Sequence, residues 1–141
     1  MVTRTVPYAD PGRAAFEELD TYIQNFLLAG SHPELAPAYS FPLPLSATYA
    51  QFTVVGLNSS GELVPATWNA TPANAIKPIG IIAHAVARGA SGAPAVNGQV
   101  FYSGCFNQDA LVWDASFDTD AKKQAAFRGS PTPTNIIVKK R

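Results

Sequence analysis

The stretch that decides the fold covers residues 99 to 129. It reads Gln99-Val100-Phe101-Tyr102-Ser103-Gly104-Cys105-Phe106, later Leu111-Val112-Trp113, and then Asp118-Thr119-Asp120-Ala121-Lys122-Lys123-Gln124-Ala125-Ala126-Phe127-Arg128-Gly129. Its apolar first part predicts one strand from Gln99 to Phe106. Asp118 is expected to cap a short helix that ends at Gly129, with Asp120 in the first turn, where the helix dipole favours a carboxylate. The stretch holds no catalytic grouping of a nucleophile, a base and an orienting group.

Around this stretch the pattern is mainly that of a β protein. Tyr49 to Leu57 predicts a strand, and the turn Asn58-Ser59-Ser60-Gly61 leads into a short strand at 62–65, so a hairpin is expected. A long or bulged strand is predicted at 75–87, with Gly80 allowing another backbone to approach, and a last strand at 136–138. With 12 Pro and 10 Gly in 141 residues, the composition suits a loop-rich β domain.

The first third of the chain has a different character. Asp10 and Pro11 can start an amphipathic helix whose apolar positions are Phe16, Leu19, Ile23, Phe26 and Leu27, with Gly30 as its stop. An extended conformation of Tyr22 to Gly30 is the alternative to this helix. Four prolines between Ser31 and Ser46 exclude a regular helix and a central strand, so this segment is interpreted as a stiff connector. We therefore divide the chain into an N-terminal arm and connector at 1–46 and a β domain at 47–141.

Charge and cysteine content limit the environment and the partners. The formal net charge is zero, but six basic and no acidic residues follow Ala121, so the end carries +6 and the rest −6. No aromatic residues are interleaved with these bases, so we expect a solvated end and no direct nucleic-acid binding. Because Cys105 is the single cysteine, the chain cannot form an intrachain disulfide. The absence of a disulfide is compatible with a reducing cytoplasm. No leader pattern and no apolar run of about 18 residues is present, so neither export nor a membrane span is expected.

Residues capable of catalysis or metal binding are few. His32 and His84 are the available imidazole bases, and Cys105 is placed where a small buried hydrophobe fits, so we predict a packing role for the thiol. His84 interrupts an apolar run and is expected on the wetter face of a strand. Asp114, Asp118 and Asp120 lie close in sequence, but their spacing fails the calcium-loop pattern. The sequence therefore predicts no enzyme, no cofactor and no metal site.

Three segments in the same order resemble the lambda-type head decoration proteins of tailed phages, the protein D family. They are the hairpin Leu57-Asn58-Ser59-Ser60-Gly61-Glu62-Leu63-Val64 with Trp68, the apolar Pro78-Ile79-Gly80-Ile81-Ile82-Ala83, and the 99–129 stretch. The resemblance covers residues 52 to 138. It implies a mainly β fold of the β-clip or small barrel-like type, with a short C-terminal helix.

The same resemblance implies a capsid decoration function. A family member binds the major capsid protein of the expanded shell as a homotrimer, sits on the outer surface of the virion after assembly in the host cytoplasm, and protects the shell against the pressure of packaged DNA. The N-terminal arm is implied as a principal contact. The candidate capsid-contact residues are its apolar positions Phe16, Leu19, Tyr22, Ile23, Phe26 and Leu27.

Two other interpretations stay open at this point. The protein is alternatively a virion-surface module that binds a receptor or glycan through Trp68, Trp113 and Tyr102, provided that these rings are exposed together. The apolar arm positions alternatively cover only the protein's own β domain or a neighbouring subunit, because amphipathic stripes usually belong to a core. An enzyme is the third and least supported class.

Overall fold

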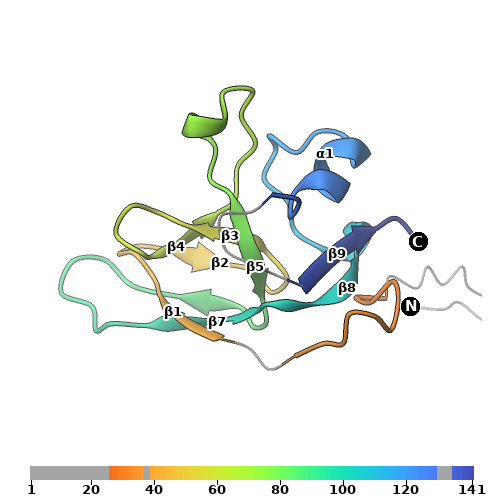
Figure 1. The fold of residues 1–141 in the computed structure, drawn as a ribbon. Helices are drawn as coiled ribbons and strands as arrows, with labels where there is room; N and C mark the ends of the chain where they lie inside the picture. The colour runs from red at the N-terminus through yellow and green to blue at the C-terminus, as the bar shows by residue number, and fades with distance from the viewer. Residues whose placement is uncertain (1–25, 37–38, 130–134) are drawn as a thin grey trace, which may run out of the picture.

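The fold is seen in a computed structural model that describes residues 26–36, 39–129 and 135–141. Short strands, two 3-10 turns and one helix follow one another in these segments (Figure 1). Their bounds are β1 Tyr39–Pro42, β2 Thr48–Tyr49, β3 Val54–Leu57, β4 Leu63–Pro65, η1 Pro72–Asn74, β5 Pro78–Ile82, β6 Val86–Ala87, β7 Asn97–Phe101, β8 Ser103–Asn107, η2 Gln108–Ala110, α1 Asp120–Ala125 and β9 Asn135–Lys139. The expectation of a mainly β protein with a short helix near its end is confirmed.

The largest sheet has five antiparallel strands in the order β1-β7-β5-β3-β4. The predicted hairpin joins β3 to β4 with Leu57 opposite Leu63, and the Asn58 side chain closes the turn by accepting from the Ser60 and Glu62 amides. Gly80 allows the predicted close approach, since a Cβ there would lie 2.5 Å from the carbonyl oxygen of Phe101. The sheets of the described residues do not close into a barrel.

Three long strands expected from the sequence are each divided in the structure. The 49–57 segment breaks between β2 and β3, where Phe52 has a φ of 65° and its amide donates to the carbonyl of Ile82. The 99–106 segment breaks at Tyr102, so that β7 joins the large sheet while β8 pairs in parallel with β9. The 75–87 segment likewise splits into β5 and β6. Because of each break, one predicted strand contributes its two halves to two different sheets.

The core lies on both faces of the large sheet. Neighbouring side chains of a strand point to opposite faces, so Val54 packs into one cluster and Val55 into the other. The first cluster also contains Phe106 and joins the sheet to β8, β9 and the 111–127 segment. The second lies under β1, β2 and β4 and contains the fully buried Leu43 and Leu63. Because both faces are covered, β5 is buried at every position and its sequence is continuously apolar.

The Pro-rich segment at 31–46 is more than a connector. It supplies β1, which pairs with β7 at the edge of the large sheet, where a strand tolerates proline. Leu43, which follows β1, is completely buried, and its carbonyl accepts from the Arg88 guanidinium at 2.6 Å. The boundary between residues 46 and 47 stays a prediction, but 39–43 contributes both a strand and a core residue to the sheet.

The short helix begins one residue later than the sequence indicates. Its cap is Thr119, whose hydroxyl accepts from the Lys122 amide at 3.3 Å, and Asp118 instead bonds the Lys122 ammonium one turn later. Asp120 occupies the first turn as predicted. The segment after α1 continues as a turn to Gly129, where a φ of 65° suits glycine.

Candidate functional site

The first surface of interest is where the arm meets the β domain. We call it the arm entry, and it consists of residues 26–29 beside β8. Leu28 forms an antiparallel bridge with Phe106, and the Ala29 amide donates to the Cys105 carbonyl at 2.9 Å. The Asn107 amide donates to the Leu27 carbonyl at 2.8 Å. Strand β8 therefore lies between β9 on one side and the arm on the other (Figure 1).

The side chains of residues 26–28 alternate in their exposure. Leu27 packs against the core cluster that contains Phe106, whereas Phe26 and Leu28 are 46% and 36% exposed. The guanidinium of Arg141 lies 4.4 Å from the centre of the Phe26 ring. The arm thus enters the described part of the protein with one apolar face towards solvent and the other towards the core.

The expectation that the arm helix continues to Gly30 is wrong for its last residues. Residues 26–30 are not helical but form bends on either side of a single bridge from Leu28 to Phe106, because the free edge of β8 offers backbone hydrogen-bond partners that a helix could not use. The other candidate contacts, Phe16, Leu19, Tyr22 and Ile23, and the predicted helix start lie outside the described residues. Their role in capsid contact therefore stays a prediction.

The second surface is a cleft lined by residues of α1 and of the 67–78 segment that carries η1. Both segments lie at the top of Figure 1. Its volume is about 360 Å³. Most of its lining is apolar, and the side chains of Lys77, Lys122 and Arg128 add positive charge. No acidic residue belongs to the lining. Trp68, 41% exposed, supplies its largest aromatic surface.

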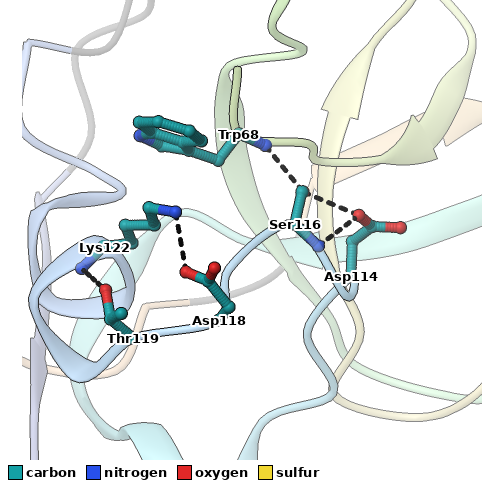
Figure 2. Close-up of polar contacts among 6 residues, drawn as sticks. All are labelled: Trp68, Asp114, Ser116, Asp118, Thr119 and Lys122. Carbon is teal, nitrogen blue, oxygen red and sulfur yellow. Dashed lines mark hydrogen bonds and ion pairs between the residues drawn. The ribbon is translucent and has the colours of Figure 1, made fainter. Parts of the chain in front are cut away.

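A connected set of polar contacts fixes the position of Trp68 (Figure 2). The Trp68 amide donates to the Ser116 hydroxyl at 2.9 Å, and this hydroxyl donates to the Asp114 carboxylate at 2.7 Å. The Lys122 ammonium lies 3.8 Å from the centre of the Trp68 ring and 2.7 Å from Asp118 Oδ1. One face of the indole is therefore covered by a cation that is itself held by a carboxylate.

The acidic residues near α1 form separate contacts. The hydrogen bond from Lys122 lowers the pKa of Asp118, and the bonds from Lys140 and Gln108 lower that of Asp120. Hydrogen bonds from Ser116 lower the pKa of Asp114. Lys140 and Arg141, expected to be solvated, contact Asp120 and Phe26 respectively, so the basic end is tied to both the helix and the arm entry.

The remaining candidates of the sequence analysis lie apart from one another. Cys105 is 1% exposed and faces Gly30, which confirms its packing role. His84 is exposed as expected but lies in a bend rather than in a strand, because β5 ends at Ile82. Trp113 contacts Phe117, and Tyr102 contacts Tyr39. In the described segments, no ring contact joins Trp68, Trp113 and Tyr102 into a shared stacking face.

Three parts of these surfaces were not found from the sequence. Asn107, 2% exposed, donates from Nδ2 to the Phe26 carbonyl and so holds the arm entry. The pairing of Trp68 with Lys122 joins residues that are far apart in the chain. Arg141 reaches Phe26 across an even larger sequence gap. Only Asn107 carried a local signal, since an Asn before a 3-10 turn commonly caps it, as it does here by accepting from the Asp109 amide.

Together, the fold and these surfaces define a small β-rich protein that has an arm entry on one sheet edge and a basic apolar cleft elsewhere. The family model of the bacteriophage lambda head decoration protein D matches residues 27–132, and the chain belongs to this family. Its class is therefore that of structural capsid decoration proteins of the phage head. No individual curated protein matches the sequence. The helices of the described residues include none with the length and hydropathy needed to cross a bilayer.

Proposed function

We propose that this protein binds the major capsid protein on the outer surface of the expanded phage shell as a homotrimer and stabilises the shell against packaged DNA. The observation that carries the proposal is the family match over 27–132, which begins at the arm entry. A ligand that binds the expanded shell better than its precursor stabilises the expanded form by mass action. Three linked contacts also dissociate more slowly than one.

The arm entry supports a shell contact through the arm. Phe26 and Leu28 turn one apolar face outward while the backbone of 27–29 is held by β8. This anchorage gives the preceding residues a fixed starting point at the surface, which lowers the entropy lost when they bind a partner. We infer that Phe16, Leu19, Tyr22, Ile23 and Phe26 contact the capsid, while Leu27 also serves the protein's own core.

We further infer a mechanical rather than a catalytic function, carried out in the assembled virion after synthesis in the host cytoplasm. The buried position of Cys105 supports this, because a nucleophilic thiol has to reach its substrate. The polar groups around α1 are used in capping and pairing with one another.

The proposal is tested with expanded shells that lack the protein. Wild-type protein should bind them saturably at micromolar concentration, form trimers in solution or on the shell, and raise the temperature at which shells rupture. Deletion of residues 1–25 should abolish binding while the β domain stays folded, because every contact described above remains. Deletion beyond residue 38 would instead remove β1 and Leu43 and damage the core.

A point-variant pair refines the arm test. Phe16→Ser with Leu19→Ser removes two predicted contacts, and Gln24→Ser with Asn25→Ser is the matched control on the predicted polar face. Weaker shell binding is expected for the first pair only. Equal binding by both pairs would contradict the arm contact, and failure of the wild type to bind shells would contradict the decoration function.

A further inference from the structure

We propose that the cleft between α1 and the 67–78 segment is a second docking site, and that it receives an acidic peptide segment with an apolar side chain from the capsid shell. This inference rests on the proposed shell binding but concerns a surface other than the arm entry. The apolar lining would take the side chain, and the basic residues would take the flanking carboxylates.

The charge of the cleft selects an acidic occupant. Lys77, Lys122 and Arg128 line it without an acidic residue among the lining. Lys122 already bonds Asp118, but in the described segments neither Lys77 nor Arg128 has a carboxylate within ion-pair distance. Both side chains belong to exposed residues. A carboxylate that enters the cleft would therefore meet two cations whose charge is not already paired, and arginine could hold it with two parallel hydrogen bonds.

The shape of the cleft selects an apolar side chain between the charges. Trp68, Pro72, Phe117 and Ala125 are among its lining residues, and its volume of about 360 Å³ is within the range of pockets that bind small ligands. Trp68 is held through its own amide and through Lys122 on its ring, so little ordering is needed on binding. A half-exposed indole in a cleft that also contains unpaired cations is typical of an interface anchor.

Charge reversal tests the site directly. Lys77→Glu and Arg128→Glu each change one exposed lining residue and should weaken binding to expanded shells about tenfold, with a smaller dependence on salt concentration. Lys139→Glu on β9 is the matched control, because it changes the net charge equally at an exposed residue outside the cleft. Equal losses in all three variants would indicate general electrostatic attraction and overturn the docking site. Unchanged binding in the cleft variants would also overturn it.

A chemical probe tests whether the cleft becomes covered on the shell. Ala121→Cys places a thiol on an exposed residue of the lining, whereas the native Cys105 is buried. We expect fast maleimide labelling of this thiol in the free protein and at least tenfold slower labelling on the shell. The control variant is Ser91→Cys, which changes an exposed residue outside the lining. Its labelling rate reports the general access of the reagent.

The outcomes separate this inference from the proposed function. Slow labelling of Ala121→Cys already in the free protein would show that this chain covers its own cleft, and would overturn a capsid occupant. Fast labelling on the shell would leave the cleft open and overturn docking there. If the wild type fails to bind shells at all, the decoration function itself is contradicted.

Discussion

Replacing Asn107 by Ala should loosen the arm entry and lower the stability of the whole domain. The side chain is 2% exposed and makes two hydrogen bonds, from Nδ2 to the Phe26 carbonyl at 3.1 Å and from the Asp109 amide to Oδ1 at 3.3 Å. Each such bond contributes about 1 kcal/mol net, so we expect the free energy of unfolding to fall by about 2 kcal/mol. For a domain of this size that corresponds to a melting temperature lower by roughly 4–8 °C.

The assay combines urea unfolding with amide hydrogen exchange. The Ala29 amide, which donates to the Cys105 carbonyl, should exchange faster in Asn107→Ala because the arm entry opens locally. Asn107→Asp keeps an acceptor for the Asp109 amide but loses the donor to Phe26, so it should open the arm entry while retaining the cap of η2. Asn97→Ala, at an exposed position of β7, is the control. Unchanged exchange of Ala29 in both Asn107 variants would refute the reasoning.

Three further predictions concern the domain itself. Gly80→Ala should lower the free energy of unfolding by about 1–3 kcal/mol, because the added methyl group meets the Phe101 carbonyl, and an unchanged urea midpoint would contradict this. Leu43→Ala should cost about 2–5 kcal/mol in the same assay, and a cost below 1 kcal/mol would count against its place in the core. Folding lowers the pKa of Asp118 and Asp120, so their contribution to stability is present at neutral pH and is lost as the pH falls through the lowered values, below about pH 4. The urea midpoint measured from pH 7 to 3 should therefore fall less steeply in Asp118→Asn with Asp120→Asn than in the wild type, and parallel curves would argue against this assignment.

Much of the fold could be predicted because its signals are local. The turn chemistry of Asn58 and Gly61 predicted the β3–β4 hairpin, and Gly80 predicted a close backbone approach. The breaks at Phe52 and Tyr102 could not be predicted, since aromatic or branched residues that favour strands lie on both sides of each position. What divides these runs is the availability of partners in different sheets, which is a non-local property.

The two surfaces were predicted less well for the same reason. The arm was recognised as apolar, but a stripe at residues 16, 19, 23 and 26 suits a helix, and the bridge that residues 26–29 form instead depends on the edge of β8. The cleft had no signal in the sequence, because the 67–78 segment, with Trp68 and Lys77, is far in sequence from Arg128.

By itself, the sequence determined the family, through three segments in the same order, and the mainly β class, and the 99–129 stretch placed Cys105 in packing and Asp120 in the first turn of the helix. These features depend on residue type and spacing over a few neighbours. Only the tertiary structure decided that β7 and β8 join different sheets, that the arm entry bridges β8 instead of forming a helix and that Trp68 lines a basic cleft. Each of these depends on which segments meet in space, because hydrogen-bonding edges and charged surfaces are formed by pairs of segments that the local sequence does not specify.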